Sequence, residues 1–373
     1  MDFISNYEES VERFKNACSD AILKSYPIGD HEINVAHFDR SGPCRLVIQA
    51  GLHGAEGYAG SAAIIDTIEQ VVGKSDWSFS FIHGANPKGM AEGTRLNQNY
   101  VDLNRAFASD LEHSNPGYNT LVDILNPKHR FTGKDAINLI KTFVEYKKSG
   151  RVNELKEAIA MGQREHPGLL FYIGQRGIDE PEVINLKKIY KRIAEKGQPF
   201  IFLDIHTGFF LNEQLIGFVP QAPGTQKFDL IDKLFESSPL TSLEQPDEGF
   251  RAVGSSIDYV DSHYENALVM APEFGTVGSK FSNGNKDHPL YGLDQTTMQL
   301  SALIRLVAGL QNRHYSTQES RLFTPSYKSV ALAERRLFLP DSKKWQKFFE
   351  HRFRTLRDKI MNDEEVLSLN WLS

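Results

Sequence analysis

The chain has 373 residues, of which 40% are hydrophobic and 24% are charged, the ordinary composition of a globular protein. Its formal net charge of −6 and the absence of a long basic run give no reason to expect nucleic-acid binding. Two cysteines, Cys18 and Cys44, cannot form a disulfide framework and indicate a reducing compartment. Because no apolar run approaches roughly 20 residues and the N-terminus lacks a secretory pattern, we expect a cytoplasmic protein without membrane association.

Apolar periodicity predicts helices that alternate with strands along most of the chain. The elements expected first are a helix over 7–25, strands over 33–38 and 46–50, a helix over 59–72, a strand over 78–82 and a polar loop over 86–107. Those expected later are a glycine-rich loop with a short strand over 162–177, a helix over 182–196, strands over 199–205 and 267–274, and a helix over 294–310. This alternation predicts an α/β fold, with a mixed, mostly parallel twisted sheet and helices on both faces.

We expect a single catalytic domain that spans residues 1–373. Residues 110–165 have charged helical patterns and little strand signal, so they are expected to form a helical insertion rather than a second core. The tail at about 340–373 is expected to be helical. Its aromatic residues are expected to pack back onto the domain: Trp345, Phe348, Phe349 and Phe353.

A histidine and a glutamate lie three residues apart in a glycine-rich segment that follows a predicted strand. Zinc accepts imidazole and carboxylate ligands, and a catalytic zinc ion takes three protein ligands. Glycines allow the turn that would point His53 and Glu56 at one ion. His206 also follows a predicted strand, and ligands collect at the carboxyl ends of strands in open α/β sheets. These three residues therefore predict a metal site, whereas His83 is interpreted as a hydrogen-bonded residue at a strand end.

Glu273 lies at the end of the strand predicted over 267–274, between Pro272 and Phe274. A carboxylate in such surroundings is costly unless it is paired or lines a cleft. Without a metal site, a salt-bridged glutamate would be the simpler interpretation. Beside one, Glu273 is the best candidate for a general base.

The polar loop carries two arginines, Arg95 and Arg105, among several amides. A guanidinium group can bind a substrate carboxylate through two parallel hydrogen bonds or stabilise a tetrahedral oxyanion. Loop solvation is the alternative interpretation, and polarity alone does not decide between the two.

Taken in chain order, these motifs resemble the zinc carboxypeptidase superfamily, the M14 metallopeptidases. The resemblance covers about residues 40–310 and rests on His53-x-x-Glu56, Arg95, Asp102-Leu-Asn104-Arg105, His206 and Glu273. The glycine-rich loop over 162–177 and the tail with Trp345 resemble the bacterial DUF2817-type branch of that superfamily.

The resemblance implies a role for each of these positions. It implies one zinc ion bound by His53, Glu56 and His206, with Asp102 accepting a hydrogen bond from the far ring nitrogen of His53. The other roles concern the substrate: Arg95 polarises the scissile carbonyl, Asn104 and Arg105 hold the terminal carboxylate, and Glu273 passes a proton from water to the leaving amine.

The sequence departs from this pattern at one position. The well-studied carboxypeptidases have a tyrosine on a mobile loop before a stretch like 254–258, and that position falls near Phe250 here. Tyr259 and Tyr264 are the two possible substitutes, and the sequence does not choose between them. Ile257, where the resemblance places a pocket-floor residue, indicates an apolar substrate side chain.

We therefore expect a zinc-dependent hydrolase that cleaves a peptide or peptide-like amide bond next to a free carboxylate. One alternative is a deacylase of N-acyl amino acids, like aspartoacylase or succinylglutamate desuccinylase; those relatives usually add a β-rich C-terminal domain, which a helical tail does not match. The other is a non-catalytic zinc-stabilised binding protein, which would have no need for a base such as Glu273. Another divalent ion would also suit the ligands, and the oligomeric state is not predicted.

Overall fold

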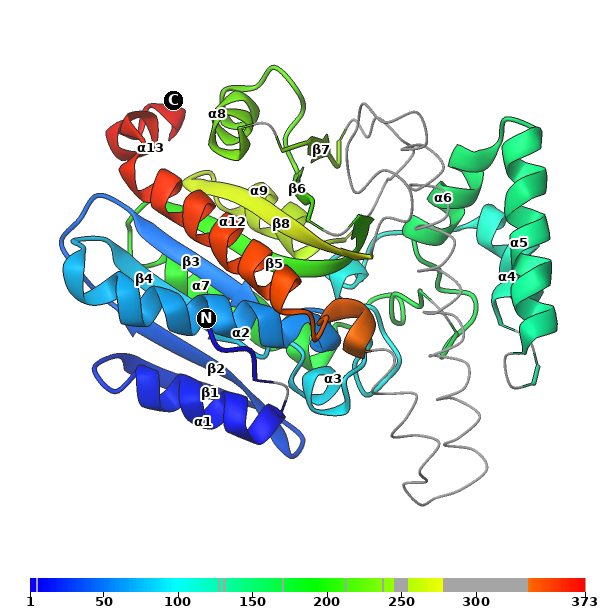
Figure 1. The fold of residues 1–373 in the computed structure, drawn as a ribbon, viewed down its shortest axis with the longest axis horizontal. Helices are drawn as coiled ribbons and strands as arrows, with labels where there is room; N and C mark the ends of the chain where they lie inside the picture. The colour runs from blue at the N-terminus through cyan, green and yellow to red at the C-terminus, as the bar shows by residue number, and fades with distance from the viewer. Residues whose placement is uncertain are drawn as a thin grey trace.

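The computed structural model describes residues 1–372 except for 5, 127, 130–131, 170, 212, 237, 245–253 and 278–334. Within the described residues, an eight-stranded sheet forms the centre of the molecule, in the order β1-β2-β4-β3-β5-β8-β6-β7 (Figure 1). Its strands are β1 (Ile22–Ile28), β2 (His31–Phe38), β3 (Arg45–Ala50), β4 (Ser78–His83), β5 (Phe200–Leu211), β6 (Leu215–Val219), β7 (Leu240–Ser242) and β8 (Ala267–Val277).

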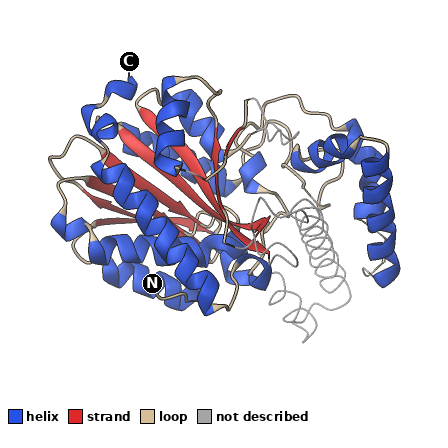
Figure 2. Cartoon of the chain, turned by 45° about the horizontal axis from the view of Figure 1, so that its top comes forward, coloured by secondary structure: helices blue, strands red, loops and turns tan. Residues whose placement is uncertain are grey.

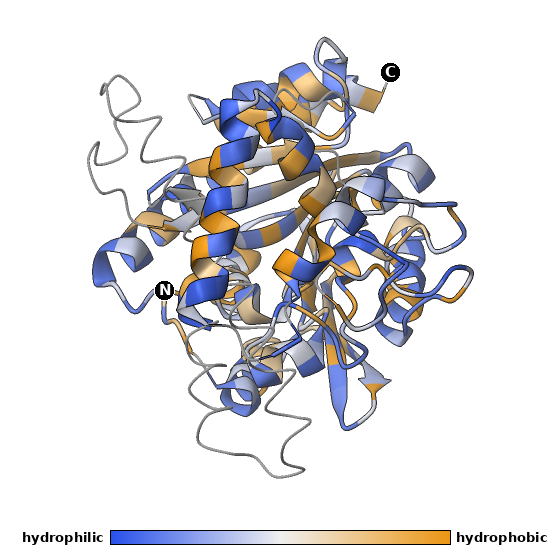
Figure 3. Cartoon of the chain, turned by 90° about the vertical axis from the view of Figure 1, so that its right-hand side faces the viewer, coloured by the Kyte–Doolittle hydropathy of each residue, from blue (hydrophilic) through white to orange (hydrophobic). Residues whose placement is uncertain are grey.

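Helices cover both faces of this sheet (Figure 2). One face packs against α1 (Tyr7–Ala17), α2 (Gly57–Gln70), α8 (Gln226–Phe235) and α12 (Lys343–Asn362). The other face packs against α7 (Pro181–Ala194) and α9 (Ser256–His263). Hydrophilic and hydrophobic residues alternate along the helices, as expected for helices with one buried side (Figure 3).

The four central strands, β4, β3, β5 and β8, run parallel. At one side β1 and β2 pair antiparallel with each other and β2 with β4, and at the other side β6 pairs antiparallel with β8 and parallel with β7. The predicted mixed, mostly parallel α/β sheet is therefore confirmed. Parallel pairing brings the carboxyl ends of the central strands to one edge, where Ala50 pairs with both His83 and Ile205 and His206 pairs with Glu273.

Alternate residues of a strand point to opposite faces of a sheet. In β5, Ile201, Leu203 and Ile205 belong to the core beneath α2 and α12. Phe200 and Phe202 belong to the core beneath α7 and α9. By this alternation, the residue at 206 emerges on the side of α7 and α9.

Several elements differ from the prediction. The first helix ends at Ala17 rather than at residue 25, and Ile22–Ile28 forms β1. This strand lies at the edge of the sheet and contains Pro27, which edge strands tolerate and helix interiors do not. Four elements were not predicted (β6, β7, α8 and α9), and the segment expected to be a polar loop contains α3 (Pro87–Glu92) and a 3₁₀ turn at Leu103–Arg105. The helix predicted over 294–310 lies outside the described residues.

The segment expected to form an insertion contains α4 (Pro116–Leu125), α5 (Gly133–Lys148) and α6 (Val152–Ala160), at the right of Figure 1. These helices share an apolar cluster with Phe338, which precedes α12. The tail is helical, with α12 followed by α13 (Glu364–Ser368) and a short 3₁₀ turn (Asn370–Leu372). Its predicted packing is confirmed, since Trp345, Phe349 and Phe353 are buried and Phe348 is partly buried against the core. Among the described helices, none combines the length and the apolarity that crossing a bilayer requires.

Candidate metal centre

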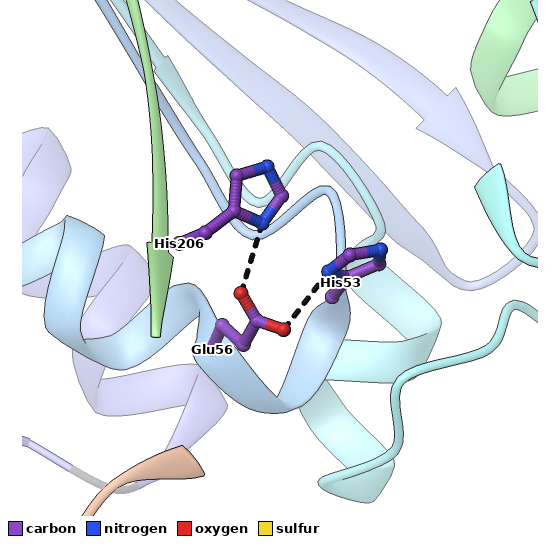
Figure 4. A group of neighbouring side chains, drawn as sticks. All are labelled: His53, Glu56 and His206. Atoms are coloured by element: carbon purple, nitrogen blue, oxygen red, sulfur yellow. Dashed lines mark hydrogen bonds and ion pairs between the residues drawn. The ribbon is translucent and has the colours of Figure 1, made fainter. Parts of the chain in front are cut away.

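Three predicted ligands, His53, Glu56 and His206, converge at the carboxyl edge of the sheet (Figure 4). One ligand atom from each lies within 4.8 Å of the others, and all three side chains are buried. The Glu56 carboxylate lies between the two imidazoles, with Oε1 2.8 Å from Nδ1 of His53 and Oε2 2.9 Å from Nδ1 of His206. The donor set and its convergence fit a divalent metal ion such as zinc.

The turn after β3 depends on glycine. Gly51 has a φ of +81°, a conformation that L side chains rarely adopt. A Cβ on Gly54 would lie 2.1 Å from the carbonyl carbon of Gly89. The 3₁₀ turn Gly54–Glu56 can therefore pack against α3, which brings Glu56 back toward His53.

The electrostatics of the group are those of a buried ion-pair network. Burial raises the pKa of Glu56, but His53 and His206 outweigh it and hold that pKa well below its usual value. Burial lowers the pKa of His206, but Asp204 and Glu56 outweigh it and hold that pKa well above its usual value. Glu56 also accepts a hydrogen bond from the main-chain nitrogen of Thr207 at 3.0 Å.

Asp102 lies where the resemblance implied. Its Oδ1 is 3.2 Å from Nε2 of His53, on the side of the ring away from Glu56. Its Oδ2 accepts a hydrogen bond from Nε of Arg95 at 3.0 Å. Burial raises the pKa of Asp102, but Arg95 and His53 outweigh it and hold that pKa well below its usual value. Asp102 thus joins a candidate ligand to the candidate oxyanion-stabilising arginine.

The three other residues of the polar loop lie near the same edge but make different contacts. Arg95 is 8% exposed, and its Nη1 is 3.7 Å from Oε1 of Glu56. Asn104 is half-buried, and its Oδ1 accepts a hydrogen bond from the main-chain nitrogen of Ser256 at 3.2 Å. Arg105 is buried, and its Nε and Nη1 donate to the carbonyl oxygens of Ala160 and Asn104, each at 2.7 Å.

Glu273 stands on β8 directly beside His206, its register partner on β5. Its side chain is half-buried and forms no hydrogen bond with the residues that the structure describes. Burial, reinforced by the negative charge of Glu56, raises the pKa of Glu273 to about 8. Glu56 therefore tends to stay ionised, whereas the neighbouring Glu273 tends to hold a proton.

Tyr259 and Tyr264 were considered as substitutes for the loop tyrosine. Tyr259 lies on α9, and Tyr264 follows the last residue of that helix. The Tyr264 ring is 6.1 Å from the ring of Phe200, which begins β5, about 20 Å along the strand from His206. Tyr259 stacks on His263, with ring centroids 4.0 Å apart, and lies 5.6 Å from the ring of Phe107.

Three further positions complete the comparison with the sequence. Phe250 lies outside the described residues. Ile257 is buried in the core beneath α7 and α9. His83 is buried on the other side of the sheet, where its Nε2 is hydrogen-bonded to Ser10 and Ser61, so its interpretation as a hydrogen-bonded strand-end histidine is confirmed.

Sequence reasoning missed one residue of the site, Asp204. Its Oδ2 lies 3.1 Å from Nε2 of His206, the ring nitrogen that faces away from Glu56. The signal was present, because a residue two positions before His206 on a strand shares its face of the sheet.

Comparisons with known proteins give one family and several distant structural likenesses. No curated protein matches the chain. Similar solved structures include a candidate metallopeptidase from Shewanella baltica OS155, with 15% identity, a TM-score of 0.41 and coverage of 82% of this chain and 92% of that one. A metallo-carboxypeptidase from Pseudomonas aeruginosa, in complex with (2-guanidinoethylmercapto)succinic acid, has 16% identity and a TM-score of 0.43, with coverage of 80% and 68%.

A succinylglutamate desuccinylase/aspartoacylase from Rhodobacter sphaeroides has 11% identity and a TM-score of 0.39, with coverage of 75% of this chain and 63% of that one. TM-scores below 0.5 at such identities do not establish a common function. The family match is of another kind, because the model described as "Protein of unknown function (DUF2817)" matches residues 3–349. As the glycine-rich loop and the tail predicted, the chain belongs to the DUF2817 family.

Proposed function

We propose that this protein is a zinc-dependent hydrolase that cleaves a peptide or peptide-like amide bond next to a free carboxylate. One observation carries the proposal: His53, Glu56 and His206 converge in a buried group, and Glu273 lies beside it on the adjacent strand. Ligand-type side chains and a carboxylate without a hydrogen-bond partner among the described residues are the minimum set for metal-assisted hydrolysis.

His53, Glu56 and His206 would hold one zinc ion. Bound there, zinc would act as a Lewis acid and would lower the pKa of water from about 15.7 to about 7. The arrangement of the side chains supports this assignment, since the carboxylate lies within hydrogen-bond distance of Nδ1 of both imidazoles. A metal ion can replace the protons of this network because imidazole binds metals in its neutral form.

Glu273 would act as the general base and then as the general acid. Its carboxylate accepts the proton of the attacking water and gives it to the nitrogen of the leaving amine. Burial and the charge of Glu56 raise the pKa of Glu273 toward neutral pH, and a group that both accepts and donates a proton works best when its pKa lies near the operating pH. Its side chain is partly exposed, as a direct contact with a substrate requires.

Arg95 would stabilise the oxyanion that develops on the scissile carbonyl. Asp102 fixes the guanidinium through its Nε, and the group lies beside Glu56 and therefore beside the candidate metal position. A donor that is held in place before the reaction needs no rearrangement during it.

Asn104 and Arg105 would hold the terminal carboxylate of the substrate. The amide nitrogen of Asn104 and Nη2 of Arg105 form no hydrogen bond with the described residues, whereas the other polar atoms of both side chains are engaged. This leaves one donor on each side chain for an incoming carboxylate.

Glu273 favours an enzyme over a binding protein. A half-buried carboxylate that forms no hydrogen bond with the described residues lowers stability, and a catalytic role would account for its presence.

The test is hydrolysis of a panel of blocked dipeptides with free and with amidated C-termini, alongside N-acyl amino acids, with and without a chelator. We expect chelator-sensitive cleavage of the free dipeptides. Chelator-insensitive cleavage would exclude the metal mechanism, and equal cleavage of the amidated dipeptides would remove the carboxylate-binding role. Cleavage of the N-acyl amino acids alone would identify the deacylase, and zinc binding without any turnover would identify the binding protein.

A further inference from the structure

Each candidate ligand histidine is held on both sides of its ring. Nδ1 of His53 faces Glu56 and its Nε2 faces Asp102. Nδ1 of His206 faces Glu56 in the same way, and its Nε2 faces Asp204 (Figure 4 shows this nitrogen pointing away from Glu56). Asp204 therefore contacts His206 in the way that Asp102 contacts His53.

We propose that Asp204 and Ser256 are positioning residues for His206 and that they link this ligand to Asn104 of the substrate-binding loop. The inference rests on the proposed function for the roles of His206 and Asn104. The positioning contacts themselves are present in the structure.

Asp204 is fully buried on β5, two residues before His206. Its Oδ2 lies 3.1 Å from Nε2 of His206, an ion pair whose alignment falls short of a good hydrogen bond. Among the described residues, His206 is the one cationic side chain paired with Asp204. A buried carboxylate is costly without such a partner, so the contact constrains the orientation of the imidazole ring.

Ser256 holds Asp204 in place. It is the first residue of α9, it is fully buried, and its Oγ donates a hydrogen bond of 2.5 Å to Oδ2 of Asp204. The preceding residue, Ser255, caps α9 through a reciprocal pair of hydrogen bonds with Asp258. Because this capping box fixes the first turn of α9, the Ser256 hydroxyl is already oriented toward the strand.

Asn104 closes the network into a ring. Its Oδ1 accepts a hydrogen bond from the main-chain nitrogen of Ser256 at 3.2 Å, and its own main-chain nitrogen donates to Oδ1 of Asp102 at 3.1 Å. The ring runs in this order: Asn104, Asp102, His53, Glu56, His206, Asp204, Ser256 and back to Asn104. Both candidate ligand histidines are therefore connected through this network to Asn104 of the proposed substrate-binding loop.

The experiment measures the affinity of the full chain for Zn²⁺ by competition with a chromophoric chelator. Outer contacts of ligand histidines typically contribute about 10- to 100-fold in metal affinity. We expect Asp204→Asn to weaken zinc binding by that order and Ser256→Ala to weaken it by a smaller factor. The double variant should bind zinc no more weakly than Asp204→Asn alone, because Ser256 acts through Asp204.

Ser61→Ala is the matched control. Ser61 is a buried serine on the opposite side of the sheet, hydrogen-bonded to Ser10 and His83, and its loss should leave zinc affinity unchanged. A second readout separates positioning from simple support of the fold. A positioning role reduces the rise in Tm that zinc produces, whereas a purely structural role lowers Tm equally with and without zinc.

Zinc affinity of Asp204→Asn within twofold of that of the unaltered protein would overturn the inference, as would additive losses in the double variant. If Asp204→Asn fails to fold, Ser256→Ala and its zinc-dependent Tm decide the question. Failure of the unaltered protein to bind zinc would overturn the proposed function itself, and the inference with it. Zinc binding without hydrolysis would leave the positioning role intact and remove only the catalytic one.

Discussion

Glu56 and Glu273 show how position decides the role of a carboxylate. Both belong to the same edge of the sheet, yet the two imidazoles lower the pKa of Glu56 while burial and the charge of Glu56 raise the pKa of Glu273 to about 8. Neighbouring carboxyl groups whose pKa values are shifted in opposite directions are typical of a site in which one stays ionised and the other acts as an acid or base.

Replacement of Glu273 by glutamine should separate catalysis from metal binding. We expect Glu273→Gln to lower turnover by about 10²- to 10⁴-fold, the usual contribution of a positioned general acid or base, with zinc content unchanged. Turnover and metal content measured on the same preparation check this. Parallel loss of zinc and activity would instead make Glu273 a ligand.

Substitutions of Arg95 and His53 should also separate an effect on turnover from an effect on metal binding. Arg95→Ala should lower turnover by about 10²- to 10³-fold, as for the loss of one oxyanion donor, with zinc retained. His53→Ala should lose the metal, because it removes one of the three proposed ligands. Equal zinc loss in the two variants would contradict the role of Arg95.

Zinc binding should release protons at neutral pH. Burial lowers the pKa of His206, but Asp204 and Glu56 outweigh it and hold the pKa well above its usual value, so the metal-free ring carries a proton at pH 7 that the metal must displace. The affinity for zinc should therefore rise with pH, up to the pH at which the His206 imidazole loses this proton without the metal. Calorimetry in buffers of different ionisation enthalpy measures the release, and zero net protons released at pH 7 would contradict the expectation.

At the scale of elements, the sequence was informative wherever a strand ends at the carboxyl edge. The apolar runs before His53, His206 and Glu273 predicted their positions, because parallel strands bring such ends together. The edge strand Ile22–Ile28 was missed, since its exposed face continues an apparent helical period. The contact of Arg105 with Ala160 joins residues 55 positions apart, and no local pattern encodes it.

The turn after β3 gives a prediction at the same scale. A Cβ on Gly54 would meet the backbone of Gly89 and Met90, at 2.1 Å and 2.2 Å, so Gly54→Ala should displace Glu56. Overpacking of this kind costs about 1–3 kcal/mol, which urea unfolding measures, and zinc affinity should fall. Gly73→Ala is the control, because a Cβ there meets nothing within 4 Å. Equal behaviour of the two variants would show that Gly54 is not needed to shape the site.

At the scale of the whole molecule, the C-terminal tail supports the two strands that carry His206 and Glu273. Thr207, the next residue after His206, donates from Oγ1 to the carbonyl oxygen of Phe338 at 2.6 Å. Trp345 is fully buried and donates from Nε1 to the carbonyl oxygen of Gly275 on β8 at 2.8 Å. The tail therefore contacts both strands within two residues of the candidate site.

Two tryptophans of the tail separate support of the site from general stability. Trp345→Phe removes the hydrogen bond to the Gly275 carbonyl on β8, whereas Trp371→Phe removes a hydrogen bond from Nε1 to the Val366 carbonyl that lies within the tail. Each change should lower the free energy of unfolding by about 0.5–1.5 kcal/mol, the usual net contribution of one hydrogen bond. Trp345→Phe should also lower turnover, because β8 carries Glu273, and Trp371→Phe should not. Equal turnover in the two folded variants would mean that the tail stabilises the fold without positioning the site.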